Sequence, residues 1–254
     1  MGRKLLVFDV GNSRLKAALY DDGRLIARAS LSAVGDRAGE TWDKAQVVNV
    51  LESRFAPRGT PDRCLVASVV RGADGVIHKA VQTVWEIAPQ VVDTEMDLGI
   101  GVAVPRPDHV GIDRLLQASE AFRVCAGSVV VAAFGSALTV DVVTADGVFC
   151  GGTIAPGLGL GVRALHDETS LLPHVALQPP DSAVGTDTAS CIQAGIVYGA
   201  AGAVERLFCE LVPDGGATVV LTGGDAELLA PFINYPHRVE PDLVMRALVS
   251  LGQR

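Results

Sequence analysis

Short apolar runs alternate with longer stretches of helical periodicity along most of the chain. Runs bounded by glycine, aspartate, asparagine or serine indicate strands, and the longer stretches indicate helices. The predicted strands are 4–10, 15–20, 25–30, 63–69, 91–92, 128–133, 138–144, 148–154 and 218–221, and the predicted helices are 42–55, 75–87, 112–124, 158–170, 186–211, 226–232 and 241–251. Hairpin-linked strands followed by alternating helices and strands predict mixed sheets covered by helices.

The pattern of the first part of the chain repeats in the second. Residues 6–13 align with residues 130–137 at an offset of 124, and the Asp-Gly dipeptide at 22–23 recurs at 146–147. In both copies an apolar strand runs into a glycine-containing turn, a second strand follows, and Asp-Gly turns the chain into a third. The sequence therefore predicts two related halves.

The length is consistent with that organisation. A chain of 254 residues suits one large or two modest domains, and the repeat favours two. We predict an N-terminal half over residues 1–110 and a C-terminal half over residues 111–254, facing each other across a cleft. Pro105-Arg106-Pro107 is the predicted crossing between them.

Composition narrows the functional classes. The net charge of −8 gives no electrostatic footprint for nucleic acid or for an anionic membrane surface. The five cysteines are widely scattered without a C-x-x-C pair, which predicts reduced core residues in a cytosolic protein. The apolar run 5–8 is too short for a secretory signal, and no stretch approaches a membrane span. We expect a cytoplasmic protein that binds neither nucleic acid nor membrane.

The first glycine-containing turn carries candidate phosphate chemistry. Asp9 interrupts a buried strand near its carboxyl end, where open α/β sheets place their ligands. A lone aspartate at a strand end is more often a turn or cap residue. Here Gly11, Asn12, Ser13 and Lys16 follow it, and Mg²⁺ prefers a carboxylate together with waters and phosphate oxygens. These residues favour a phosphate and magnesium site.

A second candidate opens the helix predicted at residue 112. Gly111-Ile112-Asp113-Arg114 places an acid beside a fixed cation. One interpretation is structural, because the helix macrodipole favours aspartate in the first turn. The other is chemical: Asp113 takes a proton from a substrate hydroxyl while Arg114 binds an anionic group of the same substrate.

Two further segments are rich in glycine. Residues 151–159 lead into a predicted helix, and Thr222-Gly223-Gly224-Asp225 follows a predicted strand. The glycine density of residues 151–159 indicates close approach of the backbone to a ligand or to another chain. The turn at 222–225 could pack against an adenosine.

Together these residues resemble the type III pantothenate kinase family, also called the Bvg accessory factor family, a branch of the acetate and sugar kinase, Hsp70 and actin superfamily. Five motifs match in order over nearly the whole chain: residues 9–13, 111–114, 135–141, 151–157 and 185–188. The resemblance implies duplicated actin-like (ribonuclease H-like) halves, each a mixed sheet covered by helices, with a cleft between them.

The resemblance also implies a reaction, the ATP-dependent phosphorylation of pantothenate to 4'-phosphopantothenate, the first step of coenzyme A biosynthesis, by a homodimer. By carry-over Asp113 is the general base, and Asp9 holds Mg²⁺ through water. The implied ATP-binding residues are Asp9, Val10, Gly11, Asn12, Ser13, Arg14, Leu15, Lys16 and Ser136. The implied pantothenate-binding residues are Val104, Gly111, Ile112, Asp113, Arg114 and Thr188.

Two positions depart from the family pattern. Ala133 stands where the family usually has an aspartate associated with a monovalent cation, and Val104 stands where it has a tyrosine. A K⁺ or NH₄⁺ requirement is therefore in doubt. Two alternatives stay open: a nucleotide-binding regulatory protein of the same fold with weak or no kinase activity, and a kinase for a different small alcohol.

Overall fold

The computed structural model describes residues 3–33, 42–212 and 215–254. Its compact units are unit 1 (Met1–Leu98, Arg106–Glu120 and Val244–Arg254) and unit 2 (Gly99–Pro105 and Ala121–Leu243). Unit 1 therefore gains two segments from beyond residue 105. The boundary predicted at 110/111 separates the two repeats and stays a prediction, whereas the compact units follow other bounds.

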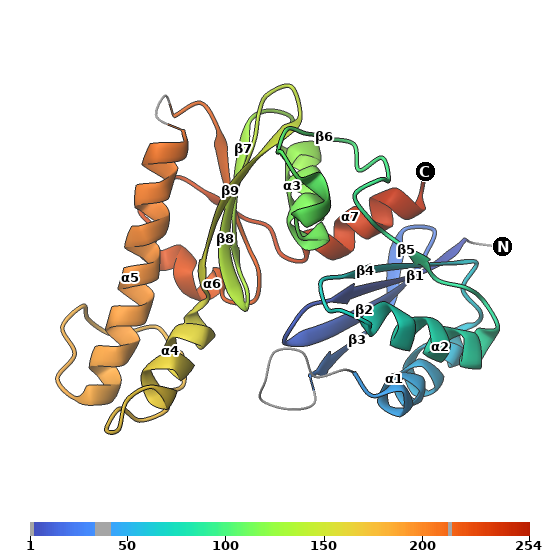
Figure 1. Cartoon of the computed structure of the whole chain (residues 1–254), viewed down its shortest axis with the longest axis horizontal. Coiled ribbons are helices and arrows are strands. Elements are labelled where there is room, and N and C mark those ends of the chain that lie inside the picture. Colours follow the sequence, from blue (N-terminus) through green and yellow to red (C-terminus); the bar gives the residue numbers. More distant parts are fainter. Residues whose placement is uncertain (1–2, 34–41, 213–214) are drawn as a thin grey trace. The chain divides into compact units, whose positions relative to one another are not determined.

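Unit 1 contains a five-stranded sheet with the order β3-β2-β1-β4-β5 (Figure 1). Its strands are β1 (Lys4–Val10), β2 (Arg14–Asp21), β3 (Arg24–Ser32), β4 (Arg63–Ser68) and β5 (Gln90–Val91). The first three form an antiparallel meander, and β4 and β5 add in parallel on the other side of β1.

Unit 2 contains a six-stranded sheet with the order β11-β10-β7-β8-β9-β6. Its strands are β6 (Gly101–Val102), β7 (Val129–Phe134), β8 (Ala137–Val143), β9 (Val148–Pro156), β10 (Thr218–Thr222) and β11 (Arg238–Val239). Apart from β6, their order and directions match those of unit 1 strand for strand. The predicted repeat of mixed sheets is confirmed.

The first turn differs in length between the copies. Val10 pairs with Leu15, so four residues lie between the last paired residues of β1 and β2. Phe134 pairs with Leu138, so three residues lie between the last paired residues of β7 and β8. The turn of the second copy is therefore one residue shorter, and β8 corresponds to β2 at an offset of 123, as Leu138 to Leu15.

The following hairpin restores the offset. Asp21 pairs with Arg24 across a two-residue turn. In the second copy the N–H of Thr144 donates to the carbonyl of Val148 at 2.9 Å, across three residues. The offset of 124 predicted from the sequence therefore holds for the first and third strands of each copy but not for the second.

The helices lie close to their predicted positions. They are α1 (Lys44–Val50), α2 (Ala73–Trp85), α3 (Ile112–Cys125), α4 (Leu158–Asp167), α5 (Thr188–Leu211), α6 (Ala226–Leu229) and α7 (Leu243–Gly252). The helix predicted over 42–55 is α1 followed by a π-helical turn, and the one predicted over 226–232 is α6 followed by a 3₁₀ turn. Strands β6 and β11 were not predicted, because each has two residues of which one is Gly101 or Arg238, so neither forms an apolar run.

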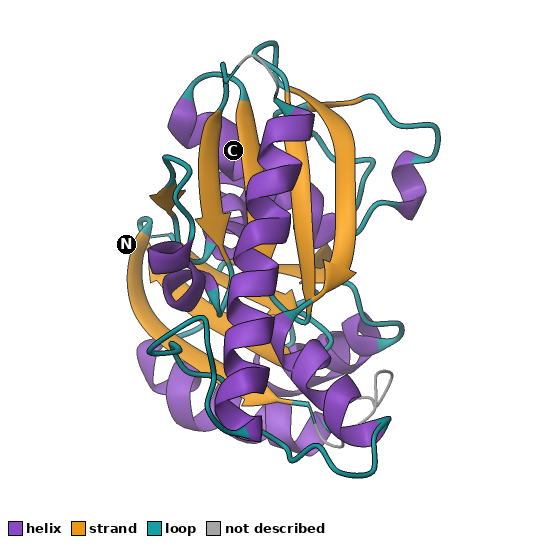
Figure 2. Cartoon of the chain, turned by 90° about the vertical axis from the view of Figure 1, so that its left-hand side faces the viewer, coloured by secondary structure: helices purple, strands orange, loops and turns teal. Residues whose placement is uncertain are grey.

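Each sheet has its own core. In unit 1, Leu6 and Phe8 of β1 pack in one cluster with side chains of α1 and α2, and Leu5, on the opposite face, lies against Gly252 of α7. In unit 2, Phe134 of β7 and Phe208 of α5 share a cluster. Figure 2 shows α5 running along the strands of this second sheet.

The cysteines are all free thiols. Only Cys64 is buried, which raises the pKa of its thiol, while Cys150, Cys191 and Cys209 are exposed. The prediction that the cysteines are core residues is therefore wrong for these three. Among the described residues, no helix has the length and apolar character needed to cross a membrane.

Candidate functional site

The first candidate group lies at the carboxyl end of β1. Asp9 is directly opposite Lys16 of β2 and beside Ala67 of β4 in the sheet register. Opposed residues of an antiparallel pair project from the same face, so a carboxylate and an ammonium group are neighbours here. Val10 and Leu15 are buried in the core, so only their backbone could face a nucleotide.

The turn that follows is polar at its tip. The N–H of Gly11 donates to the carbonyl of Arg14 at 2.9 Å, which closes the turn. Asn12, Ser13 and Arg14 are exposed. The glycine amide is therefore used within the turn, and the residues after it present the polar surface.

The start of α3 lies near this strand end. A Cβ placed on Gly111 would be 3.7 Å from Cγ1 of Val69, the residue that follows β4. The N–H of Val69 in turn donates to the carbonyl of Val10 at 3.1 Å. Within unit 1, Gly111 is therefore anchored next to the carboxyl ends of β1 and β4.

Asp113 occupies the second position of α3. Its Oδ1 accepts a hydrogen bond from the N–H of Arg114 at 2.9 Å, and a Cβ on Gly111 would lie 2.6 Å from the same oxygen. Burial raises the pKa of Asp113, and the hydrogen bond and charge of Arg114 only partly oppose this. A carboxylate held in this way binds a proton more tightly than an ordinary aspartate, as suits a general base.

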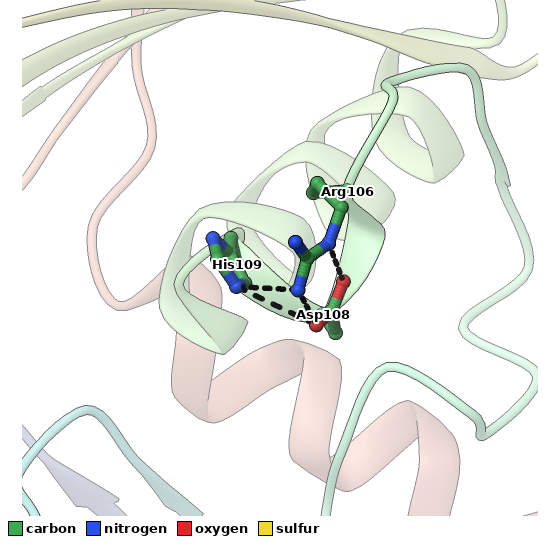
Figure 3. Close-up of polar contacts among 3 residues, drawn as sticks. All are labelled: Arg106, Asp108 and His109. Atoms are coloured by element: carbon green, nitrogen blue, oxygen red, sulfur yellow. Dashed lines mark hydrogen bonds and ion pairs between the residues drawn. The ribbon is translucent and has the colours of Figure 1, made fainter.

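A charged cluster precedes α3 (Figure 3). Arg106 donates two hydrogen bonds to the carboxylate of Asp108, at 3.1 and 2.9 Å, and its Nη2 lies 2.7 Å from Nε2 of His109. Arg106 holds the pKa of Asp108 below its usual value. Because these side chains are more than half exposed, the cluster contributes little stability to the 3₁₀ turn, Pro107–His109, that leads to Gly111.

The second turn, in unit 2, is enclosed by backbone. Ser136 is exposed, and its carbonyl accepts from the N–H of Gly157 at 3.2 Å. A Cβ on Gly157 would overlap the carbonyl oxygen of Gly135, and one on Gly223 would overlap that of Phe134. Three glycine-containing segments thus meet at the end of β7, and the close approach of Gly157 is to another segment of the same chain.

Ala133 sits at the end of β7 at the place that Asp9 has in β1. It pairs with Thr139 of β8 and Thr222 of β10, and all three side chains are buried. Thr139 corresponds to Lys16 of the first copy. The charged pair of unit 1 is therefore replaced by an alanine and hydroxyl groups.

Thr188 is the first residue of α5 and is exposed. Asp187 caps this helix: its Oδ1 accepts from the N–H of Ser190 at 2.9 Å, and Ser190 Oγ accepts from the N–H of Asp187 at 3.1 Å. The hydrogen bond from the N–H of Ser190 to the carboxylate lowers the pKa of Asp187. The capping box fixes where the chain presents Thr188.

Val104 follows β6 and is half-buried, with Cγ1 3.6 Å from where a Cβ on Gly151 would lie. Val104, Ser136 and Thr188 belong to unit 2, whereas residues 9–16 and 111–114 belong to unit 1. The structure thus gives two separate groups of candidate residues, each ordered within its own unit.

Comparison with known proteins gives a consistent result. A family model described as type III pantothenate kinase matches residues 5–210. Type III pantothenate kinases of Phenylobacterium zucineum and Rhodospirillum rubrum are 32% and 33% identical to the chain, each with 98% of both chains covered. The crystal structure of ethanolamine utilization protein EutJ from Carboxydothermus hydrogenoformans has a TM-score of 0.55 at 15% identity, covering 99% of this chain and 90% of that one. This last likeness concerns the fold alone.

Proposed function

The chain belongs to the type III pantothenate kinase family, and on that premise we propose which residues perform its reaction. The activity is the ATP-dependent phosphorylation of pantothenate to 4'-phosphopantothenate, in coenzyme A biosynthesis. Membership in this family agrees with the predicted fold class, duplicated actin-like halves, and with the predicted enzyme class. The alternative of a regulatory protein without turnover is not favoured by it.

One observation carries the proposal for the base. Asp113 is held at the start of α3, its pKa is raised by burial, and Gly111 beside it is anchored near the strand end that bears Asp9. Asp113 accepts the proton of the primary hydroxyl of pantothenate as that oxygen attacks the γ-phosphorus of ATP. The new O–P bond forms while the bond from the γ-phosphorus to the ADP oxygen breaks, in line.

The proposed ATP-binding residues belong to the segment 9–16 of unit 1 and, for Ser136, to the turn between β7 and β8 of unit 2. Lys16 contributes a positive charge beside Asp9, and the exposed polar residues of the first turn meet the phosphates. The proposed ATP-binding residues are Asp9, Val10, Gly11, Asn12, Ser13, Arg14, Leu15, Lys16 and Ser136.

The donor set fits magnesium bound largely through water. Among the described residues, no three His, Cys, Asp or Glu side chains cluster as a metal cage. A single carboxylate with retained waters and phosphate oxygens is the usual Mg²⁺ arrangement, and Asp9 is the residue that would hold it. The ion would supply charge neutralisation and alignment of the triphosphate.

Arg114 is the proposed anchor for the carboxylate of pantothenate, because a fixed guanidinium suits a carboxylate. The proposed pantothenate-binding residues are Val104, Gly111, Ile112, Asp113, Arg114 and Thr188. Ile112 is buried, so its contribution comes from the backbone. Val104 keeps an apolar wall without the hydroxyl of the tyrosine that the family usually has there.

We further propose a cytoplasmic homodimer. Unit 2 exposes large apolar side chains, with Leu171 91%, Val184 75% and Ile154 65% exposed. A second copy would remove such surface from water, a favourable change. Sedimentation equilibrium checks this, and a monomer at micromolar concentration would contradict it.

The direct test of the function is a coupled ADP-release assay with MgATP and pantothenate. We expect release that requires the primary hydroxyl, so an analogue without this hydroxyl gives none. Asp113→Asn should keep the fold and ATP binding but lower turnover by roughly 10²–10⁴-fold, the usual worth of a general base. Asp74→Asn is the matched control, an exposed aspartate in the first turn of α2, and should leave turnover unchanged.

The pH profile sharpens this test. Because the base acts when ionised and its pKa is raised, kcat/KM should fall on acidification at a pH above the ordinary aspartate value of about 3.9. Wild-type turnover in the Asp113→Asn variant would remove Asp113 from the mechanism. A folded protein that binds ATP but releases no ADP with millimolar pantothenate, with or without K⁺ or NH₄⁺, would contradict the kinase function itself.

A further inference from the structure

A row of polar side chains runs along one face of α3. Asp113, Gln117 and Glu120 are spaced four and three residues apart, which places them on one side of the helix. Glu120 is only 1% exposed, and two residues of α7 satisfy it. Its Oε1 lies 3.3 Å from Nε of Arg246, and its Oε2 accepts from Oγ of Ser250 at 3.2 Å. The inner end of the row is therefore fully engaged.

Gln117, in the middle of the row, is not fully hydrogen-bonded. Oε1 of Gln117 is buried and accepts no hydrogen bond from the described residues; Asp21 Oδ1 is the other described side-chain oxygen in this state. Burying an amide oxygen without a donor is costly, so native proteins rarely leave one in this state. A buried acceptor without a partner in the ligand-free chain indicates that something else donates to it when the protein works.

Helix geometry gives the direction in which Gln117 points. At about 100° per residue, position 117 lies about 40° around the helix from Asp113 and about 60° from Arg114. The side chain of Gln117 therefore leaves the helix between those of Asp113 and Arg114, one turn further along. All three belong to the same segment of unit 1.

We infer that Gln117 binds pantothenate, with Oε1 accepting a hydrogen bond from a donor in the middle of the substrate. This rests on the proposed function, in which Asp113 faces the primary hydroxyl at one end and Arg114 the carboxylate at the other. Pantothenate carries two donors between those ends, a secondary hydroxyl and an amide N–H. Gln117 thereby selects substrates that have a hydrogen-bond donor between the hydroxyl and carboxylate ends. In the enzyme without substrate, the amide oxygen of Gln117 is left without a donor among the described residues.

The experiment compares Gln117→Met with wild type. Methionine keeps the length of the side chain but has no comparable acceptor. We expect KM for pantothenate to rise roughly threefold to tenfold, the worth of one neutral hydrogen bond, while kcat and KM for ATP stay within about twofold. Gln82→Met, the same change at an exposed position of α2, is the control and should alter none of them.

Two substrate analogues identify the donor. One lacks the secondary hydroxyl, and the other has an ester oxygen in place of the amide N–H. With the analogue that lacks the relevant donor, the variant and wild type should have the same KM, because the interaction is already absent. If the full ratio persists with both analogues, Gln117 does not contact either donor and the inference fails.

Thermal unfolding separates binding from structure. Without substrate, Gln117→Met should unfold at the wild-type temperature or above it, because it removes an unsatisfied buried oxygen. A lower unfolding temperature with equal losses for both substrates would show a structural role and overturn the inference. Wild-type protein without pantothenate-dependent ADP release would overturn the proposed function instead, whatever the variant does.

Discussion

The two halves repeat a scaffold but not its chemistry. At the end of β1, Asp9 stands opposite Lys16, whereas at the matching place in β7, Ala133 stands opposite Thr139. Strand order, strand direction and the glycine that closes the first turn are the same in both. The two sheets thus share a backbone architecture, whereas the charged pair at the strand end is present in the first copy and absent from the second.

The halves also differ in how the strand end is covered. A Cβ on Gly11 or Gly135 would meet a carbonyl oxygen at 3.5 or 3.6 Å, an ordinary contact. In the second half, however, Gly157 and Gly223 bring two more backbone segments against the end of β7, with no room for a side chain. The strand end of unit 2 is therefore covered by backbone, whereas the strand end of unit 1 carries a pair of charged side chains.

The largest expected effect comes from breaking that enclosure. Gly157→Ala forces a methyl group into the carbonyl of Gly135, so either α4 or the β7–β8 turn must move. We expect a loss of about 2–4 kcal/mol in the free energy of unfolding, from steric strain in a packed region. Urea unfolding measures it.

Gly159→Ala is the matched control, two residues further along and inside α4, whose N-cap is Gly157. There the new Cβ would lie 3.7 Å from Nη1 of Arg163, an ordinary contact, and alanine should stabilise the helix by about 0.5–1 kcal/mol. Opposite signs for the two variants support the enclosure. A Gly157→Ala protein as stable as wild type would show that the strand end is not tightly covered.

A smaller effect tests the missing charge of the second half. Ala133→Asp places a carboxylate at a site that is 6% exposed, beside Thr139 and Thr222. Without a cation it should destabilise by about 1–3 kcal/mol, and K⁺, which takes hard oxygen ligands, should recover part of that loss. Unfolding in KCl and NaCl at equal ionic strength measures the difference.

Ala133→Asn is the control for polarity without charge and should show no preference for K⁺. Wild type should respond little to K⁺ in the ADP-release assay, because Ala133 offers no ligand. Strong activation of wild type by K⁺ over Na⁺ would mean that other groups already form a cation site, and the contrast between the halves would then be one of residue identity only.

Local patterns in the sequence predicted most of the fold. Strands β1 to β4 and β7 to β10 follow from apolar runs, and the repeat follows from aligning residues 6–13 with 130–137. The turn after Phe134 is one residue shorter than its counterpart after Val10. The sequence did not predict this difference, because the next hairpin is one residue longer and restores the offset. Register depends on pairing between strands, which a one-dimensional alignment does not contain.

The candidate site likewise has features that the local sequence predicted and features that it did not. Residue type and spacing were enough to predict Asp9 and Asp113 as candidates. The anchoring of Gly111 by Val69 and the unsatisfied oxygen of Gln117 were not predicted, because both depend on contacts or burial set by distant segments. A glutamine four residues after the aspartate is a visible signal, but many helices carry one without function.

The smallest expected effect concerns the hairpins that follow the first turns. Asp22 and Gly23 have φ values of 46° and 77°, as a two-residue type I′ turn requires, whereas in the three-residue turn of the second half Gly147 has φ 75° and Asp146 is not left-handed. Asp22 also accepts a hydrogen bond from the N–H of Arg3 at 2.8 Å.

Asp22→Ala should therefore cost about 0.5–1.5 kcal/mol, because alanine tolerates the left-handed region poorly and the hydrogen bond is lost. Asp146→Ala should stay within about 0.5 kcal/mol, as for an ordinary exposed substitution. Urea unfolding of both variants gives the comparison, and Asp22→Gly separates the causes, because it removes the hydrogen bond while relieving the backbone. Equal losses of stability for Asp22→Ala and Asp146→Ala would contradict this interpretation. They would mean that the aspartate has the same role in both Asp-Gly dipeptides, although the two turns differ in length.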